Sequence, residues 1–248
     1  KVVDVVMVGF EESRSHYDNP EKVVVTGTPV RGDFFQYTKK EAREKLGIND
    51  DRPLLLSFFG SLGAAVMNDH MTAILSREVR MGAPFHHIHG AGRDYAGMRA
   101  RLEQEGLRVD GDSVKLANDP KDTGVELREY IYDMPLIMAA ADLVVCRAGA
   151  STISELTAIA KPAVLVPSPN VVADHQTKNA RVLSDRGAAL LVSEQECDGK
   201  TDAFFNTVSD LLNHPEKREN MAKALREMAI PDASEHIYQT LVGLLKGK

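Results

Sequence analysis

The sequence has few cysteines, no tryptophan, no excess of basic residues and no long apolar run. Its 248 residues include two cysteines, Cys146 and Cys197, too few for a disulfide framework and typical of a reducing cytosol. The net charge of −6 excludes a general basic field that would attract nucleic acid. No apolar segment approaches the roughly 20 residues of a membrane-spanning helix. Any membrane contact is therefore expected to be peripheral.

The N-terminal residues predict strands that need partners. The segment 2–8 (VVDVVMV) is almost continuously apolar, which is typical of a strand covered on both faces. A second short strand is expected at 21–25, closed by Gly27 and Pro29. We interpret both as the end of a sheet whose other strands lie upstream, with a break near residues 32–37.

Further along, strands and helices are predicted to alternate. Strands are expected at 54–59, 85–89, 125–131, 143–146, 163–167 and 188–192. Helices are expected at 38–47, opened by a capping box of Thr38 and Glu41, and at 64–80, 95–105, 135–141, 151–160, 176–186, 201–212, 215–229 and 234–245. Residues 106–124 show no clear periodicity beyond a short strand around 114–116. This alternation predicts an α/β fold with a doubly wound parallel sheet.

Four loops that leave predicted strands have unusual compositions. They follow Phe59, Ile131, Cys146 and Pro167, and ligands of open parallel sheets bind beyond such carboxyl ends. The first loop, 59–64 (FGSLGA), has two glycines before a helix start. It is either an anion-binding loop or only a tight turn. It matches neither a Walker A loop nor a full GxGxxG motif, which disfavours ATP hydrolysis and simple NAD binding.

The loop after Cys146 brings small residues and hydroxyls into a helix start, another potential anion site. Its Glu155 has two possible roles. Thr152 and Glu155 have the spacing of a capping box, in which the glutamate only bonds a backbone amide. Alternatively, the carboxylate accepts hydrogen bonds from both hydroxyls of a ribose.

The loop after Pro167 ends at a helix start with several polar side chains. Asp174 is a candidate N-cap. His175, Gln176 and Asn179 either read sugar hydroxyls or form an ordinary solvated helix terminus. A metal site at His87 and His89 is disfavoured, because no acidic residue or cysteine is close in sequence.

These segments, in this order, resemble the MurG family of two-lobed GT-B glycosyltransferases. The resemblance covers essentially the whole chain and rests on residues 27–31, 60–64, 132–134, 141–155, 161–167 and 173–180. This sequence differs from the family at Phe59 and Leu62, where the family usually has Gly and Gln, and at Thr28, where the family usually has Asn. Because Phe59 cannot adopt glycine-only backbone angles, the start of the first loop is expected to differ.

The resemblance implies a UDP-GlcNAc site and a role for each residue in it. Glu155 would bind the ribose and the backbone of Ile131 the uracil. Ser61 and the amides of Ala150, Ser151 and Thr152 would bind the diphosphate. Arg31 would close over the diphosphate. The GlcNAc hydroxyls would be contacted by His175, Gln176 and Asn179. Fixed N–H dipoles would stabilise the UDP leaving group, so neither a metal nor another cofactor is expected.

The family resemblance also implies an activity and a domain plan. The enzyme would be an inverting hexosyltransferase that moves GlcNAc to the 4-hydroxyl of undecaprenyl-pyrophosphoryl-MurNAc-pentapeptide, at the cytoplasmic face of the bacterial plasma membrane. Residues 1–36 would be the remnant of the acceptor lobe, 37–231 the Rossmann-like donor lobe, and 232–248 a helix returning to the acceptor lobe. The catalytic base is expected in that other lobe, and the isolated chain is expected to be inactive.

Two alternatives stay open at this stage. The chain could be a non-catalytic UDP-sugar-binding subunit that needs a partner chain. It could also belong to another GT-B enzyme, a glycolipid synthase or a UDP-sugar epimerase, although no acidic and histidine catalytic set for epimerisation can be assigned.

Overall fold

The computed structural model describes residues 3–119, 121–171 and 174–246. Val2 of the first expected strand and Ala173 of the family-like segment lie outside the described residues. The strands are β1 (Val6–Val8), β2 (Val23–Val25), β3 (Leu54–Phe58), β4 (His86–Gly90), β5 (Leu107–Asp110), β6 (Ser113–Leu116), β7 (Val125–Arg128), β8 (Leu143–Cys146), β9 (Ala163–Leu165) and β10 (Leu190–Leu191). The helices are α1 (Lys39–Lys45), α2 (Ala65–Arg80), α3 (Tyr95–Gln104), α4 (Met134–Ala140), α5 (Ala150–Ala158), α6 (His175–Ser184), α7 (Glu194–Cys197), α8 (Thr201–Asn213), α9 (Pro215–Met228) and α10 (Ala233–Lys246).

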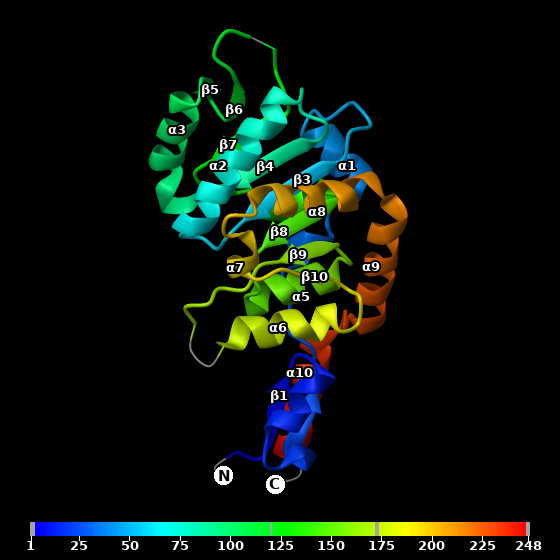
Figure 1. Cartoon of the computed structure of the whole chain (residues 1–248). Coiled ribbons are helices and arrows are strands. Elements are labelled where there is room, and N and C mark those ends of the chain that lie inside the picture. Colours follow the sequence, from blue (N-terminus) through cyan, green and yellow to red (C-terminus); the bar gives the residue numbers. More distant parts are fainter. Residues whose placement is uncertain (1–2, 120, 172–173, 247–248) are drawn as a thin grey trace.

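The large sheet confirms the predicted doubly wound α/β fold. Its strand order is β10-β9-β8-β3-β4-β7-β6-β5, and all pairs from β10 to β7 are parallel (Figure 1). From the central β3 the chain builds first toward β4 and β7. It then returns to the other side of β3 with β8, β9 and β10. The strand order therefore reverses between β3 and β8, which is where such sheets bind ligands.

Helices cover both faces of this sheet because successive strand residues point to opposite sides. Leu55 packs with apolar residues of α2, α3 and α8 in one core cluster. Its neighbours Leu54 and Leu56 pack with residues of α1, α4, α5, α6 and α9 in the other cluster. All three leucines are buried, as the uninterrupted apolar run 54–56 predicts for a central strand.

The segment expected to be largely irregular, 106–124, contains an antiparallel hairpin of β5 and β6. The expected strand at 114–116 exists, but its partner was missed. Leu107 and Val109 are buried while Arg108 and Asp110 are exposed, so a two-residue alternation is present but only four residues long. The expected strand 125–131 ends at Arg128, and α7 was not expected. The capping box of Thr38 and Glu41 is confirmed.

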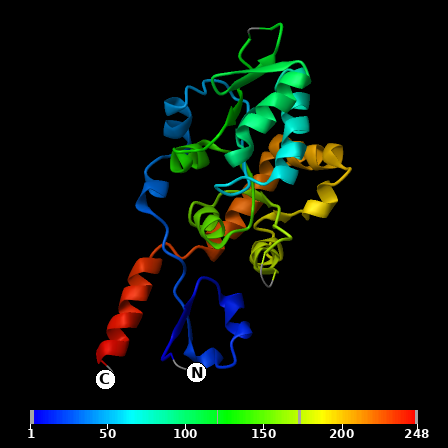
Figure 2. The same ribbon diagram turned by 90° about the vertical axis from the view of Figure 1, so that its left-hand side faces the viewer.

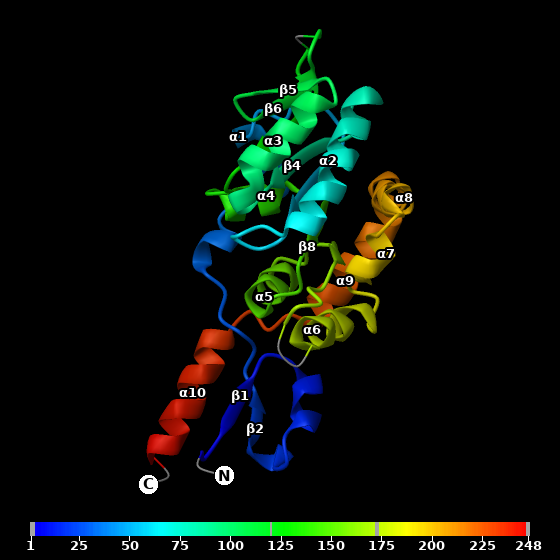
Figure 3. The ribbon, with the colours of Figure 1, turned by 60° about the vertical axis from the view of Figure 1, so that its left-hand side comes forward.

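The N-terminal strands form a separate small sheet. β1 and β2 pair in parallel, with short 3₁₀ turns at Glu11–His16 and Pro20–Lys22 between them. This sheet and α10 extend from the same end of the α/β body (Figures 2 and 3). α10 leaves Tyr238, Leu241 and Leu245 exposed. Among the described residues, no helix combines the length and apolar character needed to span a bilayer.

Candidate functional site

A cleft of about 740 Å³ opens at the carboxyl ends of the central strands, beside the reversal between β3 and β8. Seven of the ten sequence-predicted site residues line it: Arg31, Ser61, Ile131, Ser151, Thr152, Glu155 and Gln176. The lining also includes Phe34, Phe58, Phe59, Gly60, Leu62, Gly63, Ala64, Gly90, Gly92, Glu129, Tyr130, Met134, Arg147, Gly149 and Ser168. The tertiary structure thus brings the four predicted loops to one cleft.

The loop of residues 60–63 is a tight turn held by a second loop. Gly60 and Gly63 have φ of +85° and +74°, and the Gly63 amide donates to the Gly60 carbonyl at 3.1 Å. A Cβ on Gly63 would lie 2.1 Å from the Ala91 carbonyl oxygen. Both residues therefore need to be glycine, one for its backbone angle and the other also for space.

The loop that holds this turn, residues 90–93 at the end of β4, connects three strand ends. The amide of Arg93 donates to the Leu62 carbonyl at 3.1 Å. The amides of Ala91 and Gly92 donate to the carbonyls of Arg128 and Glu129, both at 2.9 Å. Sequence reasoning gave this loop no role, although its Gly90-Ala91-Gly92 composition was a signal.

The first turn of α5 faces the cleft. Gly149 is the N-cap in an extended conformation and has no side-chain cap, and the first intrahelical amide bond is from Ile153 to the Gly149 carbonyl at 2.9 Å. Helix geometry leaves the amides of Ala150, Ser151 and Thr152 without intrahelical acceptors, and the helix dipole makes this end positive. The arrangement suits an anion. Ala150 itself is exposed at the helix start and is not among the lining residues.

The capping-box interpretation of Glu155 is wrong. α5 begins at Ala150, so Thr152 is its third residue rather than its cap. Glu155 is instead half-buried and lines the cleft. Burial raises the pKa of its carboxyl, opposed by the charge of Arg31 and reinforced by that of Asp33. An acceptor-only carboxylate in such a place suits paired hydroxyl donors.

Arg31 lies at the rim of the cleft. Its side chain is largely exposed, it forms an ion pair of 3.4 Å with Asp33, and its guanidinium lies 5.6 Å from the centre of the Phe34 ring. The cation is therefore held on one side and open to solvent on the other. It can meet a phosphate, which would compete with the Asp33 carboxylate for the guanidinium.

The loop before α6 is only partly in the cleft. Gln176 lines it, and its side-chain oxygen accepts from the Ser168 amide at 2.9 Å. Asn179 does not line the cleft, and it donates to the Ala148 carbonyl at 3.1 Å. His175 is exposed at the helix start and is also absent from the lining.

Asp174 occupies the N-cap position of α6, as expected, but does not act as a side-chain cap. Its φ of +51° places it in the left-handed region, where aspartate is one of the more tolerated residues. No side-chain capping hydrogen bond accompanies that position.

The loop after β7 contributes a buried residue between two exposed rings. Ile131 is 6% exposed, and its side chain blocks the space beside Gly90. Tyr130 and Tyr132 are exposed and contact each other edge to face, with 4.9 Å between ring centres. This leaves the backbone of Ile131 at the cleft with its side chain anchored in the core.

Sequence reasoning missed Arg147 as a lining residue. Its guanidinium donates to the carbonyls of Val166 and Pro167, both at 3.1 Å, and lies 5.7 Å from the Phe59 ring centre. Phe59 is buried with an ordinary negative φ, so the departure from glycine there is accommodated in the core. Arg147 therefore connects the ends of β8 and β9 under the cleft.

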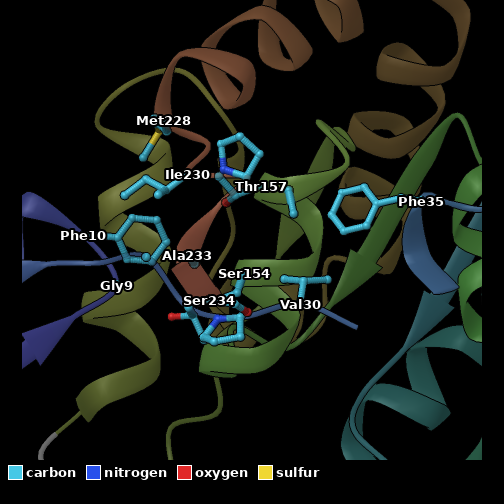
Figure 4. Close-up of a pocket in the computed structure, with 15 residues that line it drawn as sticks. Gly9, Phe10, Val30, Phe35, Ser154, Thr157, Met228, Ile230, Ala233 and Ser234 are labelled. Atoms are coloured by element: carbon cyan, nitrogen blue, oxygen red, sulfur yellow. The ribbon is translucent and has the colours of Figure 1, made fainter. Parts of the chain in front are cut away.

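A second, much smaller pocket of about 50 Å³ lies where the N-terminal sheet meets the body. Gly9, Phe10, Val30, Ser154 and Ile230 are among its lining residues (Figure 4). Gly27 has φ +76°, and a Cβ there would lie 2.9 Å from the Ile230 Cβ. The pocket is too small for a nucleotide and marks the crossing of two chain segments.

The histidines of β4 have a partner that sequence reasoning overlooked. Glu78, distant in sequence, lies 2.8 Å from Nδ1 of His87. Even so, the described part of the chain contains no group of three or more His, Cys, Asp or Glu side chains placed to hold a metal ion.

Known proteins share the sequence pattern and the fold of this chain. The sequence profile described as the glycosyltransferase family 28 C-terminal domain matches residues 54–237. A protein of Acetivibrio thermocellus named UDP-N-acetylglucosamine--N-acetylmuramyl-(pentapeptide) pyrophosphoryl-undecaprenol N-acetylglucosamine transferase is 36% identical over all of this chain and 63% of its own length. Its namesake from Caldanaerobacter subterraneus is also 36% identical, over 96% of this chain and 61% of its own length.

The crystal structure of Acinetobacter baumannii MurG is similar in fold as well. It matches 96% of this chain and 60% of its own with a TM-score of 0.69 and 26% identity. The chain thus spans about three fifths of the length of these relatives. Since the family profile covers the whole large sheet and all four loops of the cleft, the chain belongs to glycosyltransferase family 28 through its C-terminal domain.

Proposed function

We propose that the chain is the donor-binding part of an inverting glycosyltransferase. The enzyme would move N-acetylglucosamine from UDP-GlcNAc to the 4-hydroxyl of undecaprenyl-pyrophosphoryl-MurNAc-pentapeptide in peptidoglycan synthesis. Its relatives are named as N-acetylglucosamine transferases for an N-acetylmuramyl-(pentapeptide) pyrophosphoryl-undecaprenol. The observation that carries the proposal is one cleft containing Glu155, the first turn of α5 and the loop 60–63 within a family 28 domain.

In this proposal each part of UDP-GlcNAc has a chemical partner. The backbone of Ile131 reads the uracil edge, and the Glu155 carboxylate accepts from the ribose hydroxyls. Ser61 and the amides at the start of α5 bind the diphosphate, and Arg31 closes over it. The sugar lies toward α6, where Gln176 is in the lining and His175 and Asn179 belong to the same helix, and all three are proposed to contact GlcNAc.

The proposed chemistry is a direct displacement. The acceptor hydroxyl attacks the anomeric carbon from the face opposite to UDP, so the bond to the diphosphate breaks and the configuration inverts. Negative charge then grows on the leaving diphosphate. The oriented amides stabilise that charge without reorganising, which is usually the largest single contribution of such a site, and Arg31 adds its charge when it closes over the diphosphate.

The acceptor side of the reaction is a proposal that rests on the relatives. They are longer than this chain, and we propose that the acceptor site and catalytic base belong to the portion outside the match. We further propose that the complete protein works at the cytoplasmic face of the plasma membrane, where its lipid-linked acceptor would lie, and that it binds no nucleic acid. The exposed apolar residues of α10 are available for contact with such a second lobe.

Calorimetry on the chain tests the donor site. UDP-GlcNAc should bind more tightly than UDP-glucose, and UDP alone should retain part of the affinity. If no uridine nucleotide binds, the site assignment fails. If UDP binds but the two sugars are not distinguished, the nucleotide site stands and the GlcNAc assignment fails.

A further inference from the structure

Behind the cleft, five polar side chains are fully buried in a single connected row. They are Ser57 on β3, His87 and His89 on β4, and Asn68 and Glu78 on α2, each with 0% of its surface exposed. Burying so many polar groups is costly unless each is hydrogen-bonded. They take no part in the proposed donor contacts, so the burial of these five polar side chains needs another explanation.

The contacts form a continuous series, with one side contact of 3.5 Å from Nδ2 of Asn68 to Oδ2 of Asp94. Glu78 Oε2 lies 2.8 Å from Nδ1 of His87, whose Nε2 lies 2.6 Å from Oγ of Ser57. The same Ser57 hydroxyl lies 2.7 Å from Nδ1 of His89, and Nε2 of His89 lies 3.3 Å from Oδ1 of Asn68. We call these five side chains the buried relay.

The contact of Asn68 with Ala91 fixes which atom donates in each hydrogen bond at this end of the buried relay. The amide nitrogen of Asn68 donates to the Ala91 carbonyl at 2.8 Å, because a carbonyl can only accept. The other end of that amide, Oδ1, is therefore an acceptor, so His89 must carry its proton on Nε2. Its Nδ1 then accepts from Ser57.

The directions of the remaining hydrogen bonds, from Ser57 to Glu78, follow from the Ser57 hydroxyl. Since the Ser57 hydroxyl donates to His89, its oxygen accepts from Nε2–H of His87. One further proton lies between Glu78 and Nδ1 of His87, and in either position the pair is neutral overall. Burial raises the pKa of Glu78, and it lowers the pKa of His89 to about 3, so His89 stays neutral.

The relay ends directly under the loop of residues 60–63. The Ala91 carbonyl that accepts from Asn68 is the group that a Cβ on Gly63 would strike. The next two amides of that strand-end loop bond to Glu129 and Leu62. A shift of Ala91 would therefore move the loop that faces the diphosphate.

We propose that Asn68 is a positioning residue for donor binding: the buried relay orients its amide so that Ala91 holds the loop 60–63 in its diphosphate-binding shape. Asn68 touches no ligand in this proposal, which rests on the proposed function. The phosphate side of the cleft depends most directly on the relay. On the uridine side Glu155 is held by α5, whereas Ile131 packs beside Gly90 and is linked to the loop 90–93 through the preceding carbonyls of Arg128 and Glu129.

Histidine ¹⁵N NMR on the chain tests the direction of the relay without any ligand. Both His87 and His89 should carry a proton on Nε2, and His89 should show an unprotonated Nδ1 at neutral pH. A proton on Nδ1 of His89 with none on Nε2 would reverse the relay and overturn the proposal. Because no nucleotide is involved, this result is independent of whether the proposed function is correct.

Asn68→Asp tests the consequence for binding. Aspartate has the same shape, and once ionised it cannot donate to Ala91, so at alkaline pH UDP affinity should fall about tenfold and uridine affinity should fall less. Both affinities are measured by NMR titration. Thr72→Val is the matched control, because it removes a buried hydrogen bond from the Thr72 hydroxyl to the Asn68 carbonyl on the same helix.

The comparison separates positioning from general damage. If Asn68→Asp lowers UDP and uridine affinity equally, or lowers UDP affinity no more than Thr72→Val does, the positioning role is excluded. If the wild-type chain binds neither UDP nor uridine, the proposed function fails. The histidine ¹⁵N NMR measurement still tests the direction of the hydrogen bonds in the buried relay. If Asn68→Asp does not fold, the histidine ¹⁵N NMR measurement on the wild-type chain remains the test of the relay.

Discussion

The two walls of the cleft are built in different ways. The wall at α5 is local, because an extended Gly149 followed at once by a helix exposes amides, and Glu155 lies in the same helix. The wall at residues 60–63 is long-range, because its shape depends on Gly92, on the Ala91 carbonyl and on the buried relay behind it. A local wall should tolerate changes elsewhere in the molecule, whereas a long-range wall should not.

The largest expected effect is on the long-range wall. Gly63→Val combines a left-handed backbone with a Cβ 2.1 Å from the Ala91 oxygen, so it should cost about 3 kcal/mol or more and abolish UDP binding. Gly47→Ala is the control, since Gly47 has φ +71° but open space around it, and should cost only about 1–2 kcal/mol. Chemical unfolding measures both. Equal costs for the two variants would contradict the close contact.

Acid should loosen the same wall through His89. Its folded pKa of about 3 lies below the usual 6.5, so between these values the unfolded chain binds one more proton and stability falls as pH falls. The wild type should lose about 1.4 kcal/mol per pH unit more than His89→Asn in this window. Glu78 has a raised pKa and acts in the opposite direction, but it is present in both proteins. Urea unfolding at pH 6.5 and 4.5 gives the difference, and parallel losses would mean that His89 is not buried as a neutral ring.

The local wall can be tested at Glu155. Glu155→Ala should cost about 1–3 kcal/mol of UDP affinity through unpaired ribose hydroxyls, and leave folding stability nearly unchanged. Glu103→Ala serves as the control, because Glu103 is an exposed helix residue that pairs with Arg99 on the surface of α3. Calorimetry with UDP and with 2′,3′-dideoxy-UDP should show that the loss disappears for the dideoxy compound. A loss of the same size with both ligands would remove the ribose from the assignment.

The smallest effect is expected at α6. Asn179→Ala removes a bond to the Ala148 carbonyl next to the local wall and should cost about 0.5–1.5 kcal/mol of stability. His175→Ala is the companion variant at an exposed position of the same helix. If the two residues contact GlcNAc, both variants should reduce the preference for UDP-GlcNAc over UDP-glucose while UDP affinity is retained. An unchanged preference would leave Asn179 a structural role alone.

Much of the fold follows from the sequence because its strands and helices repeat a clear pattern. The apolar run 54–56 and the alternation around it predicted a parallel sheet, and the site loops were found from where strands end. The hairpin β5–β6 was largely missed because four-residue strands give a weak signal. Glu155 could not be assigned from its spacing alone, since whether Thr152 caps the helix depends on where α5 begins.

The sequence by itself determined the amide part of the local wall: a glycine and hydroxyls at a strand-to-helix junction, where backbone geometry alone produces an anion site. It left the role of Glu155 open. Only the tertiary structure decided the long-range wall. Asn68, Glu78, His87 and Ser57 are scattered over α2, β3 and β4, and nothing in their spacing announces that they form one row beneath Ala91. The physical reason is that periodicity encodes which face of an element is buried, but not which buried polar groups of different elements meet.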